Sequence, residues 1–261
     1  MLTFHPVGGG EAPGKDDPQA QGNDRGLRVI VFSSQKGGSG KTTLCGHLAV
    51  QAELAGCGPV ALIDTDPQGS LAAWWNARAS ETPLFMKAQV DYLHEDLDQL
   101  ERSGVNLVFI DTPPAVTDTI RQIVAFADLV VIPTKPSPHD LRAVGATLDI
   151  VDSQMKQLVF VVNDAMPRAR MTSDTAIALS QHGTVAPVCV SHRVVYATSM
   201  IHGMTVVETD PGSPPALEIA DLWNYVYSRV DKPVSRGTMG TGVFQKRAAF
   251  GRRRPSQEAV A

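Results

Sequence analysis

The stretch Ser33–Thr43, SSQKGGSGKTT, carries two lysines among small residues and directly follows the apolar run RVIVF. Its end, Gly40–Thr42, matches the phosphate-binding pattern G-x-x-x-x-G-K-[ST], but Gln35 stands at the first glycine position. Small residues let successive backbone N–H groups turn toward phosphates, and the helix that follows adds its positive end. The sequence therefore predicts a phosphate-binding loop whose front half, Gln35–Gly38, departs from the pattern.

We expect the two lysines of this loop to have different roles. Lys41 is expected to hold the outer phosphates and Thr42 to bind Mg²⁺ through its hydroxyl. Lys36 lies five residues before Lys41, so the two side chains are not expected to approach the same phosphates from one direction. From spacing alone, Lys36 is either a solvated lysine or a residue with a second target. The residues expected around the nucleotide are Gly37, Gly38, Ser39, Gly40, Lys41, Thr42 and Thr43.

Three aspartates end two apolar runs farther along the chain. VALIDTD carries Asp64 and Asp66 on the same side of an extended strand, and NLVFID ends in Asp111. Three acids beside a triphosphate would repel it, so the pattern implies Mg²⁺. We expect Thr42 to bind the ion directly, and Asp111 and Asp64 to act through water. Asp66 is either a reacting group or the cap of the turn Asp-Pro-Gln-Gly.

Strand and helix patterns alternate along the chain. Strands are expected at RVIVFSS, VALIDTD, NLVFIDTP, LVVIPTKP, QLVFVVND and APVCVSH, and helices over 41–58, 91–104, 141–155 and 214–230. In the first helix, Leu44, Leu48 and Leu54 form the expected apolar face. Continuous apolar strands separated by helices predict a mainly parallel sheet covered on both faces. The expected fold is α/β and doubly wound, with ligands at the carboxyl ends of the strands.

Composition bounds the organisation of the chain. Its 261 residues, 43% of them hydrophobic, suit one large core. Residues 226–261 hold eight Lys or Arg against two acids, whereas the whole chain has a net charge of -4. This basic tail either meets an anionic partner or only aids solubility. We expect residues 1–26 and 232–261 to be disordered extensions of a folded domain over 27–231.

Apolar and cysteine patterns bear on the compartment. No run of eighteen apolar residues occurs, and the N-terminal residues lack an apolar signal core, so we expect a soluble, cytoplasmic protein. Cys45, Cys57 and Cys189 have no C-x-x-C spacing and are expected to be buried, reduced thiols rather than a metal site. Trp74 and Trp75 are expected in the core.

KGGSGKTT resembles the deviant Walker A motif of the ParA/MinD ATPases, and ALIDTDPQGSLAAWW and NLVFIDTPP fall where that family has its next two motifs. The resemblance continues through PTKPSPHDLRAVG and SHRVVYATSMIHGMTVVET, spans residues 28–230, and is closest to the small plasmid-partition ParA proteins without an N-terminal helix-turn-helix domain. It implies that residues 27–231 are a P-loop ATPase domain that binds ATP and Mg²⁺ and hydrolyses ATP slowly, stimulated by a partner.

The resemblance also implies residue roles. Lys36 would reach across an ATP-dependent homodimer to the phosphates of the other subunit, while Lys41 serves its own. Asp66 would orient the attacking water. Asn163, at the end of LVFVVN, is either placed to hydrogen-bond adenine, with the segment 185–192 against the ring, or caps the following turn. The prolines after Asp111 would form a loop that senses the γ-phosphate.

DNA is the expected surface on which the ATP cycle acts. A dimer doubles any basic patch, and phosphate contacts then add steeply. No base-reading motif is present, so binding to double-stranded DNA should be nonspecific. Each candidate is equally open to the simpler interpretation of a surface charge. The candidate residues are Arg168, Arg170, Arg193, Lys232 and Arg236.

Several functions share this type of fold. The expected one is nucleoid-associated positioning of a plasmid or chromosome through a ParB-like centromere-binding protein, or of a protein cargo through an adaptor. The alternative is MinD-like positioning on a membrane, for which the tail offers only Val243, Phe244 and Phe250 as large apolar groups. A reductase would need paired cysteines, and a metabolic ligase would leave Lys36 without a task.

Overall fold

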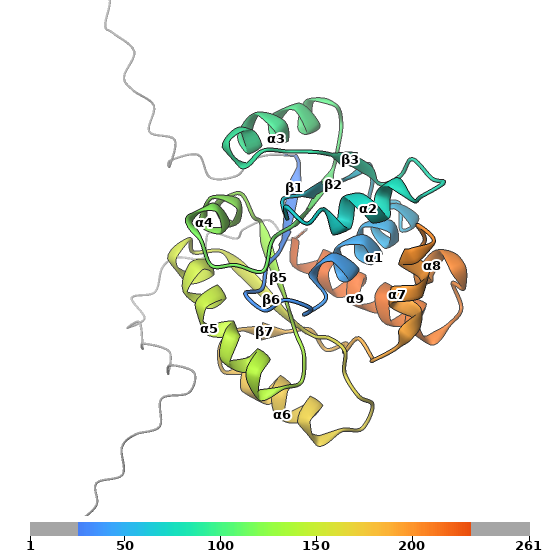
Figure 1. Cartoon of the computed structure of the whole chain (residues 1–261). Coiled ribbons are helices and arrows are strands. Elements are labelled where there is room, and N and C mark those ends of the chain that lie inside the picture. The colour runs from blue at the N-terminus through green and yellow to red at the C-terminus, as the bar shows by residue number, and fades with distance from the viewer. Residues whose placement is uncertain (1–25, 231–261) are drawn as a thin grey trace, which may run out of the picture.

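The computed structural model describes residues 26–230, which form a sheet between two layers of helices (Figure 1). The strands are β1 Arg28–Phe32, β2 Val60–Asp64, β3 Leu84–Met86, β4 Leu107–Asp111, β5 Leu129–Thr134, β6 Gln157–Val162 and β7 Thr184–Val185. The α-helices are α1 Lys41–Leu54, α2 Ser70–Asn76, α3 Leu93–Arg102, α4 Asp118–Ala125, α5 Pro138–Ser153, α6 Arg170–Ser180, α7 Val194–Ile201, α8 Val206–Thr209 and α9 Pro214–Val230. The extensions predicted before Gly26 and after 231 lie outside the described residues.

Every strand pair in the described sheet is parallel, in the order β3-β2-β4-β1-β5-β6-β7. This confirms the predicted α/β, doubly wound fold. β1 lies in the middle, between β4 and β5, where the strand order reverses and such sheets bind their ligands. In the register, Phe32 lies beside Asp111, and Asp111 lies beside Asp64. The carboxyl ends of β1, β4 and β2 therefore bring the loop and two predicted aspartates together.

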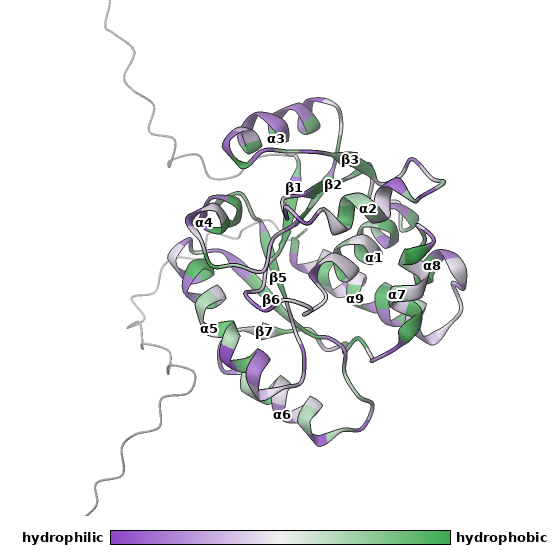
Figure 2. Ribbon diagram, in the orientation of Figure 1, coloured by the Kyte–Doolittle hydropathy of each residue, from purple (hydrophilic) through white to green (hydrophobic). Residues whose placement is uncertain are grey.

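The two faces of the sheet carry separate apolar cores. One core joins the sheet to α1, α2, α7, α8 and α9, and the other joins it to α3, α4, α5 and α6. Figure 2 shows hydrophobic residues along the strands and hydrophilic ones on outward helix faces. Side chains that alternate along a parallel strand must be apolar on both faces, which explains the unbroken apolar runs in the sequence.

Helix α5 begins three residues before its predicted start. The Ser137 hydroxyl accepts a 3.1 Å hydrogen bond from the backbone N–H of Asp140, and Pro138 occupies the first turn. Both are N-terminal signals, because the cap replaces a missing helical partner and proline has its φ already set. Helix α9 covers the predicted 214–230, and α3 lies within the predicted 91–104.

The strand predicted at APVCVSH is wrong. Only Thr184 and Val185, just before it, pair with β6 as a strand. Pro187 has no N–H to donate to a neighbouring strand, so regular pairing stops there. The segment still follows β6, because the N–H of Ala186 binds Phe160 O at 2.8 Å.

Two smaller expectations are also corrected. Leu54 is 63% exposed, because α1 ends there and the chain turns away at Gly56, whereas Leu44 and Leu48 are fully buried as expected. All three cysteines are free, but only Cys45 is buried, while the other two are half-buried. The expected core position of Trp74 is confirmed, at 5% exposed.

Candidate functional site

The loop between β1 and α1 has a buried and an exposed half. Ser39 is fully buried, whereas Gln35–Gly38 is exposed. Gly40 precedes α1 in the left-handed conformation, φ 98°, and its carbonyl accepts the first helical hydrogen bond from Leu44 N at 2.9 Å. The first N–H groups of a helix have no partner within it, so the N-terminus of α1 can bind an anion.

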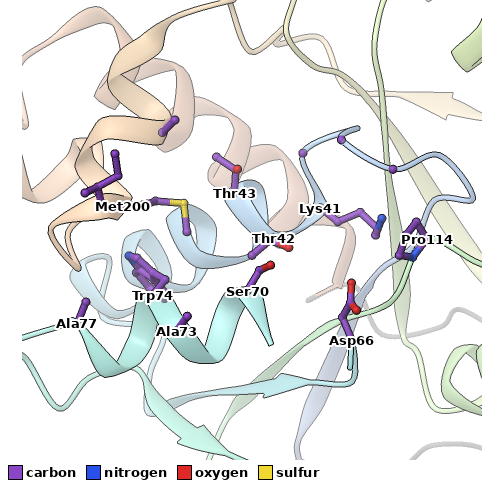
Figure 3. Close-up of a pocket in the computed structure, with 15 residues that line it drawn as sticks. Lys41, Thr42, Thr43, Asp66, Ser70, Ala73, Trp74, Ala77, Pro114 and Met200 are labelled. Atoms are coloured by element: carbon purple, nitrogen blue, oxygen red, sulfur yellow. The ribbon is translucent and has the colours of Figure 1, made fainter. Parts of the chain in front are cut away.

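A cavity of about 640 Å³ opens in front of the loop (Figure 3). Its polar end lies between the loop and Asp66, and its apolar end lies between α2 and α7. The lining residues are Gly37, Gly38, Gly40, Lys41, Thr42, Thr43, Asp66, Ser70, Ala73, Trp74, Ala77, Pro114, Ala197, Met200 and Ile201. Of the residues predicted around the nucleotide, all but Ser39 and Asn163 line this cavity.

Lys41 belongs to the buried half of the loop and is 7% exposed. Figure 3 shows its amine on the side of the cavity where Asp66 and Pro114 lie. Burial lowers the pKa of Lys41, while the nearby charges of Asp111 and Asp66 raise it. A buried lysine at the start of α1 places a positive charge where a phosphate can bind it. Lys36, in contrast, is exposed and does not line the cavity.

Asp111 and Thr42 are in direct contact. The Thr42 hydroxyl donates a 2.5 Å hydrogen bond to Asp111 Oδ2, while the other oxygen, Oδ1, is buried without a hydrogen-bond partner. Burial raises the pKa of Asp111 to about 7, against the Thr42 hydrogen bond, which lowers it. A buried oxygen without a partner beside a hydroxyl fits a divalent cation. These two residues would hold Mg²⁺, which would supply charge to offset the phosphates.

Asp64 is committed to the turn that follows β2. Its two oxygens accept 3.0 Å hydrogen bonds from the N–H groups of Asp66 and Ala72, and burial raises its pKa. Within residues 26–230, no group of three His, Cys, Asp or Glu side chains is suited to a metal ion. Mg²⁺ would therefore need phosphate and water oxygens besides Thr42, as this ion commonly does. The role of Asp64 through water stays a prediction.

Asp66 caps the turn that follows β2 and also lines the cavity. Its Oδ1 accepts a 2.9 Å hydrogen bond from Gln68 N, so the turn-capping interpretation is confirmed. The same carboxylate lines the cavity opposite the loop, where Figure 3 shows it pointing toward the Lys41 side. Capping holds the side chain in one orientation. The water-orienting role stays a prediction.

The side-chain amide of Asn163 binds the phosphate-binding loop, and its contact with adenine stays a prediction. It is 8% exposed, and its Nδ2 donates a 2.7 Å hydrogen bond to Ser39 O. A Cβ on Gly40 would lie 2.1 Å from this nitrogen. The amide is therefore packed against the loop itself. The segment 185–192 does not line the cavity, and its contact with adenine stays a prediction.

Within residues 26–230, the predicted DNA-binding residues do not share an ion-pair partner. Arg168 is exposed at positive φ, 62°. Arg170 lies 3.5 Å from Asp174, while Arg193 binds Glu218 at 3.1 Å, so the surface-charge interpretation gains a structural reason at those two positions. Lys232 and Arg236 lie outside the described residues.

The apolar end of the cavity was missed at the sequence level. It is built by Ala73 and Trp74 of α2, by Ala77 just after this helix, and by Met200 and Ile201 at the end of α7. The Trp74 ring donates to Met204 O at 3.2 Å, which ties α2 to the chain after α7. Only the paired tryptophans signalled it, and core packing explained them equally well.

Comparisons with known proteins give relatives of one kind. "Maintenance of carboxysome distribution protein A" of Halothiobacillus neapolitanus is 30% identical over 214 residues, covering 76% of this chain and 95% of that protein. "Protein ParA" of Rhizobium radiobacter is 28% identical over 198 residues, covering 74% and 79%. The septum site-determining protein MinD of Pyrococcus horikoshii, solved with Mg-ADP, has a TM-score of 0.65 at 16% identity, covering 77% and 96%, and shows the same fold.

Residues 27–214 match the VirC1 protein family. The matched range starts just before β1, contains the loop and all three predicted aspartates, and ends where α9 begins. None of the helices in residues 26–230 has the length and apolar character needed to cross a membrane. The matched range covers most of the chain and agrees with the resemblance carried by the motifs, and the chain therefore belongs to the VirC1 family of ParA-like proteins.

Proposed function

We propose that this chain is a ParA-like ATPase that dimerises with ATP and uses the cycle to position DNA or a protein cargo. The single observation that carries the proposal is that the two lysines of one loop differ in burial and in their position relative to the cavity. Lys41 is buried in the cavity, whereas Lys36 is exposed and outside it. A second lysine that lies outside its own cavity is suited to a nucleotide held by another copy of the chain.

The described residues support hydrolysis by positioning and charge. Lys41 and the N-terminus of α1 would bind the phosphates, while Thr42 and Asp111 would hold Mg²⁺. Asp66, fixed by its turn, would orient water at the polar end. Catalysis of phosphoryl transfer rests mainly on such positioning and electrostatics. Lys36 would add a positive charge only when two copies meet, which couples nucleotide state to oligomeric state.

The relatives suggest what is positioned. One has a name that refers to carboxysome distribution, and another carries the name ParA. We infer that this chain acts on the nucleoid, through nonspecific DNA binding, and that an adaptor or a ParB-like partner selects the cargo and stimulates hydrolysis. Cytoplasmic, nucleoid-associated localisation follows from that proposal.

Binding to a random-sequence DNA duplex tests the proposal. The full chain is measured without nucleotide, with ADP, and with ATP and Mg²⁺, at two salt concentrations. Tight binding only with ATP, weakened by salt, is expected because dimerisation doubles the phosphate contacts. Equal binding in all three states would contradict nucleotide control. Absence of DNA binding, together with ATP-dependent binding to anionic vesicles, would favour the MinD-like alternative instead.

A further inference from the structure

The exposed front half of the loop, Gln35–Gly38, is held at both ends by side chains from distant parts of the chain. At one end, Gln35 N donates a 3.3 Å hydrogen bond to Thr147 Oγ1. At the other end, Asn163 Nδ2 donates its 2.7 Å hydrogen bond to Ser39 O. The first anchor belongs to α5 and the second follows β6. The front half is thus a short span between two fixed points.

Both anchors are themselves fixed by packing. Thr147 is 2% exposed, and the helix that carries it packs against β5, α4 and α6. A threonine in a helix interior loses side-chain freedom and often bonds back to its own helix. Here its hydroxyl accepts from the loop instead. Asn163 is tied to the sheet, because its N–H binds Thr134 O at 3.0 Å.

The span itself has little packing of its own. Lys36 N donates to Ser34 Oγ at 3.3 Å, so the backbone next to the Thr147 anchor is restrained as well. A Cβ on Gly37 or Gly38 would meet no heavy atom within 4 Å, so no neighbouring side chain packs against these two positions. The direction in which the Lys36 side chain leaves the surface is therefore set by the anchors.

We propose that Thr147 is a positioning residue for Lys36. Its hydroxyl fixes the backbone immediately before the lysine, so that the charge is presented to a second copy of the chain in one orientation. This inference rests on the proposed function, in which Lys36 acts on the partner's nucleotide. Order that exists before association lowers the entropic cost of binding. Asn163 anchors the end next to Gly40, and its loss would disturb the chain's own nucleotide as well.

Two substitutions separate this role from packing. Thr147→Val keeps the shape and removes the hydroxyl, whereas Thr147→Ser keeps the hydroxyl and removes a methyl group. The dimer dissociation constant with ATP is measured by sedimentation, and the ATP affinity of the monomer by titration at low protein concentration. Because a single neutral hydrogen bond is lost, we expect Thr147→Val to weaken the dimer about tenfold and to leave ATP affinity within about twofold. Thr147→Ser should dimerise like the unmodified chain.

The possible outcomes discriminate between explanations. A dimer weakened more by Thr147→Ser than by Thr147→Val would mean that Thr147 only packs, and the proposal would be overturned. Unchanged dimerisation of a folded Thr147→Val would also overturn it. Lys36→Ala is measured in parallel: if it leaves the ATP dimer intact, the proposed function itself fails, whatever Thr147 does. Thermal melting checks folding, and if the valine variant does not fold, Thr147→Ala replaces it.

Discussion

The two halves of the phosphate-binding loop differ in burial, although both follow β1. The front half is Gln35–Gly38, and the back half is Ser39–Thr43. The residues of the back half are buried or half-buried and continue into α1, with the Thr42 hydroxyl hydrogen-bonded to Asp111. The front half is exposed and stands on two anchors. Gly37 and Gly38 still line the cavity, so within the front half it is Gln35 and Lys36 that lie outside it.

This difference explains why one loop carries two lysines. Burial at the start of α1 keeps Lys41 in the cavity, where a phosphate can bind its charge. Exposure on a supported span gives Lys36 access to something that arrives from outside. If this comparison is right, changes near the back half should alter nucleotide binding and hydrolysis, and a change at Lys36 should alter association between copies.

Asp66, which faces the back half, should give the largest effect. Asp66→Asn keeps an oxygen that can cap the turn through Gln68 N but removes the charge that would orient water. Loss of such a group lowers turnover by about 10²–10⁴-fold, so the ATP-bound dimer should persist. Phosphate release and dimer lifetime measure this. Normal turnover in Asp66→Asn would remove the carboxylate from the reaction, and Asp66→Ala shows the added cost of losing the cap.

The two lysines provide the direct comparison. Lys41→Ala should weaken ATP binding by about 100-fold, because a charge-assisted contact in a buried site is lost. Lys36→Ala should bind ATP within about threefold of the unmodified chain, since its side chain lies outside the cavity, but should no longer dimerise with ATP. Calorimetric titration and sedimentation measure the two properties. Equal losses of ATP affinity in both variants would show that the two halves are not separate.

The back half could be predicted from the sequence because its signals are local. A glycine, lysine and threonine after an apolar strand fix the loop, and Asp64 and Asp111 follow from strand ends that parallel pairing brings together. The other strands follow from the sequence for the same reason, with two exceptions: the short edge strand β3, Leu84–Met86, is not predicted, and Pro187 interrupts an apolar run.

The anchors could not be predicted, because they depend on tertiary arrangement. Thr147 and Asn163 lie 112 and 124 residues from their loop partners, and no spacing rule connects such positions. The position of Asn163 after β6 indicates a base contact or a turn cap, but no pattern indicates the hydrogen bond from its amide to Ser39 O. The apolar end of the cavity was hidden likewise, because an alanine-rich helix such as α2 has the same pattern whether it lines a core or a cavity.

A buried histidine, His47, is hydrogen-bonded to the back half. His47 Nδ1 donates to Thr43 O at 2.8 Å, its Nε2 has no hydrogen-bond partner, and burial lowers its pKa to about 4. The unfolded chain binds a proton near its ordinary pKa of 6.5, so stability is full above that pH. It should decline by about 3 kcal/mol as the pH falls from 6.5 to 4.

Urea unfolding between pH 7.5 and pH 4 measures this slope, with His47→Gln as the control that does not titrate. The comparison is necessary because Asp111, whose pKa is raised by burial, gains a proton in the folded state over the same range and opposes the trend. The difference between the two proteins isolates the histidine. A pH dependence that is identical in both would contradict the burial of a neutral His47.

The smallest expected effect is the loss of stability when a methyl group is added to a glycine of the loop. The same addition in each half tests the comparison between the halves. Gly40→Ala places a Cβ 2.1 Å from Asn163 Nδ2 at φ 98°, a conformation that costs about 1–2 kcal/mol for a residue with a side chain. Gly37→Ala adds the same methyl group to open space, so the free energy of unfolding should stay within about 0.5 kcal/mol. Urea unfolding measures both. Equal destabilisation would mean that the front half is packed as tightly as the back half, whereas a loss confined to Gly40 shows that only the back half is fixed by its surroundings.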